Sequence, residues 1–341
     1  MSKKELLTSS YDFFLPKELI ATYPANPRDS AKLLVYNRAA DEISHVKFSD
    51  LESFIPKECA LIFNDTKVIK ARLFGKKLSG GKIELLINKA LNAYEVSVYI
   101  RGKVKEKTKI FFAEDLKAEV KELCEDGSRV VTFYLRDKPL RFEELLPIID
   151  KIGHIPLPPY IQREDNKEDE SEYQSVFARE EGAVAAPTAS LHFTKEQHER
   201  VCKTFAHAFV TLHVGSGTFK PVECDTITEH PMHSEYYAIS DEAKKLLDSN
   251  IKILSIGTTS TRTIEFYARN KIQKGEANIF LHPDNKPLRV NHLLTNFHLP
   301  KSTLLMLVAS FVGLEKAHKL YQAAIEHKYR FYSYGDAMLI L

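Results

Sequence analysis

The spacing of apolar residues changes along the chain and divides it into parts. From about residue 66 to 140, segments such as AYEVSVYI and RVVTFYL alternate apolar with polar positions, and GG, RG and EDGS separate them. Alternation with a period of two, interrupted by turn residues, predicts antiparallel strands. Outside this region, apolar strands such as IKILSIG alternate with amphipathic helical segments. The pattern predicts a small all-β domain, a barrel or a sandwich, inserted into a mixed α/β body.

The inserted region also differs in charge. Residues 66–140 contain 17 Lys and Arg against 10 Asp and Glu, a net of +7, whereas the whole chain carries +2. We therefore predict a large α/β domain formed by residues 1–65 and 141–341, and a basic all-β domain formed by residues 66–140.

Five basic residues of this inserted domain share one parity: Arg101, Lys103, Lys105, Lys107 and Lys109. In an extended segment all five would project from one face, which would suit a phosphate backbone. The alternative is a solvated edge strand that lysines protect against aggregation.

The most distinctive stretch is VAAPTASLHFT, residues 184–194. Thr194 and Gln197 have the spacing of a capping box, and Val201 and Phe205 continue an apolar stripe, so a helix should begin after Thr194. His192 then lies about two residues before a helix N-terminus, where a neutral imidazole is favoured over a cation. The alternative is a buried loop histidine that bonds a carbonyl.

A second charged segment, residues 163–172, contains six acids, two bases and no apolar residue. Such a composition offers nothing to dock against a core. We expect this tract to be a mobile surface loop.

Composition narrows the class of protein. A length of 341 residues suggests about two domains, and 44% hydrophobic with 28% charged residues is typical of soluble globular proteins. Four scattered cysteines without a CxxC pair favour a reducing compartment. The first residues lack a signal-peptide core, and no apolar run approaches a membrane span. We therefore predict a cytoplasmic location and no membrane association.

Known cofactor and metal motifs are incomplete. HVGSGTF lacks the full GxGxxG fingerprint, and GTTSTRT lacks the lysine of a P-loop. GTTSTRT is nevertheless a predicted strand–turn–helix junction that can hold a carboxylate or ribose hydroxyls, with a purely structural cap as the alternative. No HxH or HExxH pair occurs, so we predict no metal site.

Eight ordered motifs together resemble one family. They are FNDTKVIKARLFG, GHIPLPPYI, VAAPTASLHFT, HVGSGTFKPV, HSEYY, GTTSTRTIE, TNFHLPKSTLLMLV and YRFYSYGDAMLI. In order and spacing, from about Tyr11 to Leu341, they are similar to the S-adenosylmethionine:tRNA ribosyltransferase-isomerases of queuosine biosynthesis. Ser190 departs from the pattern, because the family usually has glycine there.

The resemblance implies a bacterial cytosolic transferase and isomerase, typically monomeric, with a large distorted α/β barrel-like domain and an inserted small antiparallel β-barrel. It implies that the ribosyl part of S-adenosylmethionine is transferred to the 7-aminomethyl-7-deazaguanine base at the wobble position of tRNA. Epoxyqueuosine-tRNA forms, adenine and methionine are released, and no metal is needed. Two alternatives are a non-catalytic tRNA-binding module and an S-adenosylmethionine-dependent RNA methyltransferase.

The motifs also supply the candidate site residues. We predict His192 as the catalytic base, because an unperturbed histidine pKa lies nearest the working pH, with Glu235 as the competing base and Asp336 as an orienting partner. The methionine carboxylate would suit Arg262 and the backbone donors of the GTTST turn. The expected S-adenosylmethionine contacts are Thr188, Phe193, His213, Gly215, Gly217, Thr218, Thr258, Thr259, Ser260, Arg262 and His298. The five basic residues at 101–109 are the expected tRNA contacts.

Overall fold

The structure is a computed structural model that describes residues 3–215 and 222–341. Contacts between residues divide it into two compact units. The large unit comprises residues 1–66, 174–180 and 186–341, and the small unit residues 67–173 and 181–185. A separate two-stranded sheet pairs β4 (Thr66–Val68) with β12 (Glu180–Ala183). A search of the described residues finds no helix long and apolar enough to cross a membrane.

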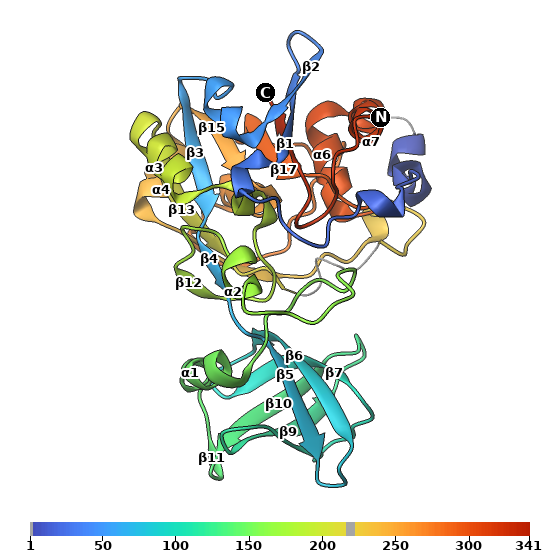
Figure 1. Cartoon of the computed structure of the whole chain (residues 1–341), viewed down its shortest axis with the longest axis vertical. Helices are drawn as coiled ribbons and strands as arrows, with labels where there is room; N and C mark the ends of the chain where they lie inside the picture. Colours follow the sequence, from blue (N-terminus) through green and yellow to red (C-terminus); the bar gives the residue numbers. More distant parts are fainter. Residues whose placement is uncertain (1–2, 216–221) are drawn as a thin grey trace. The chain divides into compact units, whose positions relative to one another are not determined.

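The large unit is built on a mixed sheet, in which nine strands are ordered within the described residues (Figure 1). The strands, from edge to edge, are β16 (Lys274–Ala277), β14 (Glu235–Ile239), β13 (His207–Leu212), β3 (Cys59–Asn64), β15 (Lys252–Ile256), β17 (His292–Asn296), β18 (Ala337–Ile340), β1 (Lys32–Asn37) and β2 (Glu42–Lys47). Four neighbouring strands, β13, β3, β15 and β17, run parallel. All six residues of β3 are buried, as expected for a strand inside a covered parallel sheet.

Apolar side chains project from both faces of this sheet, and each face packs against its own core cluster. Leu293 and Leu294 are consecutive in β17 but belong to different core clusters, because successive strand residues point to opposite faces. The cluster around Leu293 contains residues of α6 and α7, and the cluster around Leu294 contains Phe193 and Val201 near and within α3. The helices of this unit are α3 (Lys195–Thr204), α4 (Asp241–Asp248), α5 (Thr258–Asn270), α6 (Thr303–Val312) and α7 (Leu314–Glu326). The predicted start of α3 is confirmed, since Thr194 accepts a hydrogen bond from the Gln197 amide.

The small unit is a closed antiparallel barrel. Strands β10, β7, β6, β5, β8 and β9 pair in that order, and β9 pairs back with β10 (Figure 1). The strands are β5 (Arg72–Lys77), β6 (Lys82–Ala90), β7 (Glu95–Arg101), β8 (Lys109–Phe111), β9 (Leu116–Leu123), β10 (Arg129–Leu135) and, paired with β10, β11 (Lys138–Pro139). The predicted mixed fold with an inserted β-barrel is therefore confirmed.

The small unit extends further along the chain than predicted. Helix α1 (Phe142–Ile152) buries Leu145 and Ile149 in the barrel core, beside strand residues such as Leu73 and Val98. The sequence pattern assigns this helix to the large domain, because helices are expected only there. Its amphipathic spacing gives no indication of which sheet it covers.

The acidic tract at 163–172 is anchored, so the prediction of a mobile loop is wrong. Asp169 is fully buried, and both its oxygens accept hydrogen bonds from the Arg163 guanidinium, at 2.6 and 2.8 Å. Asp169 begins the short helix α2 (Asp169–Glu172), and Asp165 contacts the ring of His154 at 3.0 Å. Buried charge pairing, which composition does not reveal, holds the segment in place.

The five basic residues at 101–109 do not share one strand face. Strand β7 ends at Arg101 and β8 begins at Lys109, and the residues between them form a loop. Gly102 and Lys107 have positive φ values of 126° and 63°, so the backbone reverses and the parity argument fails. All five side chains are nevertheless exposed.

Candidate active site

The candidate site lies at the carboxyl ends of the parallel strands of the large sheet, which we call the strand edge. Because β13, β3, β15 and β17 are parallel, their carboxyl ends meet there, and this is where ligands bind in open α/β sheets. The residues at or just beyond these four ends are His213 and Gly215, Asn64 to Thr66, Gly257 to Ser260, and Asn296 to His298.

Two antiparallel strands contribute their first residues to the same edge. Strand β14 begins at Glu235 and pairs Tyr237 with Leu212 of β13, while β18 pairs Ala337 with Asn296 of β17. Glu235 and Asp336 therefore reach the edge from strands that run the other way. The sheet thus gathers motifs that lie far apart in the sequence.

His192 ends a 3₁₀ turn (Thr188–His192) and is 5% exposed. Its Nε2 lies 3.0 Å from Asn296 Oδ1. The Asn296 amide nitrogen donates to the carbonyls of Tyr332 and Ser333, at 2.9 and 3.2 Å, and this fixes Oδ1 as the acceptor toward His192. His192 Nε2 must therefore carry the hydrogen, which leaves the lone pair on Nδ1.

Burial sets the protonation state of His192. Desolvation lowers its pKa to about 4, and neither the Asn296 hydrogen bond nor the charge of Asp336 offsets this effect. The imidazole is consequently neutral near pH 7, and the Nδ1 lone pair is available to accept a proton. The pKa of about 4 does not lie near the working pH, so the case for His192 rests on the fixed neutral tautomer instead.

Asp336 does not orient His192, contrary to the prediction. Its carboxylate accepts hydrogen bonds from the backbone and side chain of Arg330 and from the Lys32 amide. Asn296 takes the orienting position instead. The physical reason is that Asp336 is 1% exposed and needs the cation of Arg330 as a partner.

Glu235 and Arg262 form a buried ion pair through Oε2 and Nη1. The other Glu235 oxygen accepts the Gly215 amide hydrogen at 3.0 Å. Arg262 thus already has a carboxylate partner within the protein, although its Nη2 is buried and has no hydrogen-bond partner among the described residues. Using Glu235 as a base would leave the Arg262 charge uncompensated, so the geometry favours His192 for that role.

The hydroxyl groups at the N-terminus of α5 differ in whether they have a hydrogen-bond partner. Ser260 donates to the carbonyl of Ile256, four residues earlier, at 2.9 Å, so this hydroxyl is satisfied within the protein, although not as a helix cap. Thr259 Oγ1 is buried without a hydrogen-bond partner in the described part of the chain, and Thr258 is 8% exposed. Gly257, with a φ of 92°, makes the turn before the helix. Thr259 Oγ1 and Arg262 Nη2 belong to residues three apart on one helix, and both lack a hydrogen-bond partner among the described residues.

Other predicted contacts lie in different environments. His213 contacts Thr66 Oγ1 at 2.7 Å and stacks on Tyr236, and burial lowers its pKa. His298 contacts Thr295 Oγ1 at 2.8 Å, and burial lowers its pKa to about 3.

Thr188 and Phe193 differ sharply in accessibility. Thr188 is half-buried, whereas Phe193 is fully buried among Phe48, Phe63 and Phe177 and presents no face to a ligand. The predicted Gly217 and Thr218 lie outside the described residues.

Sequence reasoning gave no site role to Asn296 or to the Asn64-Asp65-Thr66 turn, although both lie within the quoted motifs. Asn64 holds the backbone of Leu212 through two hydrogen bonds, at 3.0 and 3.1 Å. Asp65 pairs with Arg179 at 2.8 Å. A usable signal exists in the sequence, because the polar residues Asn64, Asp65 and Thr66 directly follow the apolar run CALIF. Within the described ranges, no group of three or more His, Cys, Asp or Glu is arranged to hold a metal ion.

Comparison with known proteins gives one family. Residues 8–340 match the family described as queuosine biosynthesis protein. The chain is 79% identical to the S-adenosylmethionine:tRNA ribosyltransferase-isomerase of Sulfurimonas denitrificans over 100% of both chains, and 60% identical to that of Nitratiruptor over 98% of this chain and 99% of the relative. It also resembles the crystal structure of S-adenosylmethionine tRNA ribosyltransferase from Thermotoga maritima, with 31% identity, a TM-score of 0.54, and coverage of 98% of this chain and 100% of that one.

Proposed function

This chain belongs to the queuosine biosynthesis protein family, and we propose that it transfers and isomerises the ribosyl group of S-adenosylmethionine onto tRNA. The acceptor is the 7-aminomethyl-7-deazaguanine base at the wobble position, and the products are epoxyqueuosine-tRNA, adenine and methionine. We propose that the protein acts as a monomer in the cytoplasm, where tRNA is available. Family membership disfavours both alternatives, the methyltransferase and the non-catalytic module.

His192 is the base in this proposal. The sulfonium of S-adenosylmethionine acidifies the hydrogens on the neighbouring ribose 5′-carbon, so the first step needs a proton acceptor. His192 Nδ1 has the free lone pair, and Asn296 holds the other ring nitrogen. This fixed, neutral tautomer is the observation that carries the assignment.

The α5 N-terminus and the Glu235–Arg262 pair bind the donor. Thr259 Oγ1 and Arg262 Nη2 are buried polar atoms without partners among the described residues, and unsatisfied buried groups are costly unless a ligand completes them. A carboxylate or a ribose hydroxyl would complete the hydrogen bonding of either atom. Glu235 then balances the charge of Arg262 and contributes a negative charge to the site of a cationic sulfonium.

Product analysis tests the proposed reaction. Purified protein is incubated with S-adenosylmethionine and tRNA that carries the precursor base, and the released small molecules are identified. We expect adenine and methionine. Release of S-adenosylhomocysteine would instead indicate methyl transfer, and binding of tRNA without consumption of S-adenosylmethionine would indicate the non-catalytic module.

A further inference from the structure

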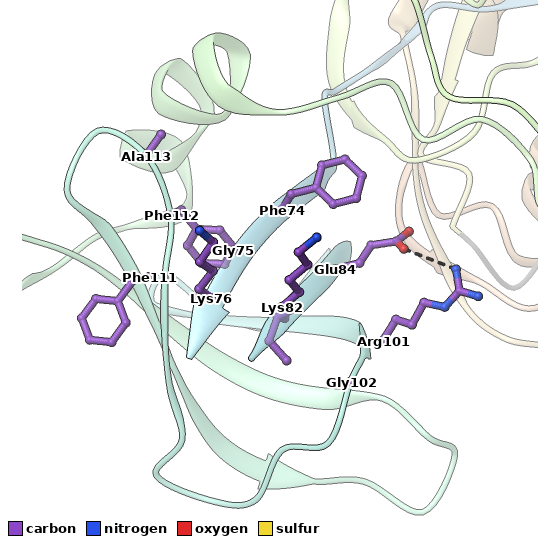
Figure 2. A pocket seen from close by; sticks show the side chains of 11 residues that line it. Phe74, Gly75, Lys76, Lys82, Glu84, Arg101, Gly102, Phe111, Phe112 and Ala113 are labelled. Atoms are coloured by element: carbon purple, nitrogen blue, oxygen red, sulfur yellow. Dashed lines mark ion pairs between the residues drawn. The ribbon is translucent and has the colours of Figure 1, made fainter. Parts of the chain in front are cut away.

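A pocket of about 830 Å³ lies on the small barrel, away from the catalytic motifs in sequence and wholly within the small unit. Its volume falls within the range of about 300–1,000 Å³ that ligand sites have. Strands β5, β6 and β7 form one wall, and the segment after β8 forms another (Figure 2). The side chains that define its chemistry are Phe74, Lys76, Lys82, Glu84, Arg101 and Phe112.

Strand register explains why these side chains gather. Phe74 of β5 lies directly opposite Glu84 of β6, which in turn lies opposite Arg101 of β7. Lys76 lies two residues after Phe74 in β5, and Lys82 lies two residues before Glu84 in β6. The two lysines lie opposite each other and share the outer face with Phe74. In Figure 2 the two lysine side chains rise from neighbouring strands on the same side as the Phe74 ring.

The facing lysines do not stabilise the barrel. Like charges directly opposite each other on a strand pair are destabilising. Glu84 lies in the pocket, but Arg72 and Arg101 already pair with it, at 3.4 and 3.7 Å. No ion pair of Lys76 or Lys82 is found among the described residues, so both exposed ammonium groups are available to bind an anion.

The aromatic residues add a stacking surface. Phe74 is 52% exposed, which is unusual for a phenylalanine on a folded barrel. The Phe112 ring lies against Gly75, where an added Cβ would be 2.8 Å from two ring atoms, so only glycine leaves room for the ring. An exposed ring beside unpaired cations is the combination that binds unpaired nucleotides, because the base stacks and the phosphate meets the positive charge.

We propose that this pocket binds an unpaired nucleotide of the tRNA substrate, with the base stacked on Phe74 and its phosphate held by Lys76 and Lys82. The inference rests on the proposed function for the identity of the RNA. The charge of the surrounding region supports it, because residues 66–140 carry a net of +7.

A single reporter tests the stacking. The chain contains no tryptophan, so Phe74→Trp introduces the only one. We expect its fluorescence to be quenched by an anticodon stem-loop RNA and much less by a fully paired duplex. Leu78→Trp is the matched control, since Leu78 is 89% exposed in the turn between β5 and β6 but does not line the pocket. Equal quenching of both reporters, or no quenching of Phe74→Trp by bound RNA, would overturn the proposal.

Binding measurements provide an independent test. Phe74→Ala should weaken binding of labelled stem-loop RNA by roughly 5- to 150-fold. Lys76→Gln and Lys82→Gln should each flatten the log–log salt dependence by about 0.7, whereas the exposed Lys138→Gln should not change it. Unchanged affinity in Phe74→Ala and unchanged slopes in both pocket lysine variants would rule out the pocket.

The two proposals fail in different ways. Wild-type protein that releases no adenine from S-adenosylmethionine, while the tryptophan of the Phe74→Trp variant is still quenched by RNA, would remove only the proposed reaction. Wild-type protein that releases adenine, while Phe74→Ala binds RNA with unchanged affinity and both pocket lysine variants keep the wild-type salt slope, would remove only the pocket.

Discussion

Polar side chains are buried at the strand edge of the large unit but exposed on the outer face of the barrel. At the strand edge, Glu235, Arg262 and His192 are buried, and each is held by a specific partner. On the barrel, Lys76 and Lys82 are exposed and face each other. Buried partners fix the position and protonation of reacting groups, whereas exposed cations act through their charge on a partner that arrives from solution.

This contrast has an energetic consequence. Removing one member of a buried ion pair leaves an uncompensated charge and costs about 3–5 kcal/mol, but exposed pairs are worth only about 0–1 kcal/mol. Changes at the strand edge should therefore affect chemistry or folding strongly. Changes to the exposed lysines of the barrel should affect RNA binding alone, in proportion to the charge removed.

The largest effect should come from the base. His192→Ala should lower single-turnover adenine release roughly 10²- to 10⁴-fold, because no other described group offers a neutral, oriented proton acceptor at that position. S-adenosylmethionine affinity, measured by titration, should change little. If His192→Ala instead loses affinity but turns over normally when saturated, His192 is a binding residue.

The buried ion pair should dominate folding stability. Glu235→Gln keeps the shape of the side chain but leaves Arg262 without a counter-charge, and should lower the free energy of unfolding by about 3–5 kcal/mol in a denaturant titration. Glu315→Gln is the control, because it breaks the exposed Lys319–Glu315 pair and should produce no measurable change. Equal effects of the two substitutions would mean that burial does not distinguish the pairs.

The same logic extends to the small unit. Asp169→Asn should also cost about 3–5 kcal/mol, since Asp169 is fully buried beside Arg163. Thermal unfolding checks this expectation directly. A variant that melts at the same temperature as the wild type would restore the interpretation of residues 163–172 as a dispensable loop.

Local signals predicted local structure well. The capping pair Thr194 and Gln197 predicted the start of α3, and alternation predicted the barrel strands. Segments whose conformation depends on distant partners were not predictable. The composition of residues 163–172 indicated mobility, because nothing local reveals that Arg163 would bury Asp169.

In the candidate site, too, the sequence indicates individual residues but not their distant partners. Motif resemblance indicated His192 and Glu235, but sequence spacing could not reveal that Asn296, 104 residues away, holds the His192 ring. The orienting role of Asp336 was predicted from its motif, and the buried pair with Arg330 contradicts it. Pairings across a sheet depend on strand order, which periodicity does not encode.

A pH dependence should follow from burial of His192. Its pKa in the folded protein is about 4, below its unfolded value of about 6.5, so the unfolded chain binds the proton first. The contribution of His192 to the free energy of unfolding is therefore fully present above pH 6.5. It is lost as the pH falls toward 4, which lowers the free energy of unfolding by about 3 kcal/mol. Urea titrations of wild type and His192→Gln at several pH values isolate the contribution as the change in their difference. A difference that stays constant between neutral pH and the folded-state pKa would contradict it.

The smallest effect per residue should come from the basic loop between β7 and β8. Five side chains in one row would flatten the salt dependence of tRNA binding by about 0.7 each when neutralised, or about 3.5 together. The backbone has positive φ values at Gly102 and Lys107, so the five cations do not form the single row that an extended strand would give. We therefore expect the combined variant of Arg101, Lys103, Lys105, Lys107 and Lys109 to flatten the slope by less than about 3.5, with S-adenosylmethionine affinity unchanged.

Glu106→Gln, in the same loop, is the control of opposite sign. It removes an exposed negative charge, so tRNA binding should strengthen slightly at low salt without losing a phosphate contact. A full loss of about 3.5 in the combined variant would mean that the loop straightens on the RNA and that the row predicted from parity forms in the complex. An unchanged slope would leave Lys76 and Lys82 as the cations of the barrel that meet the tRNA, because their register on paired strands already places them on one face.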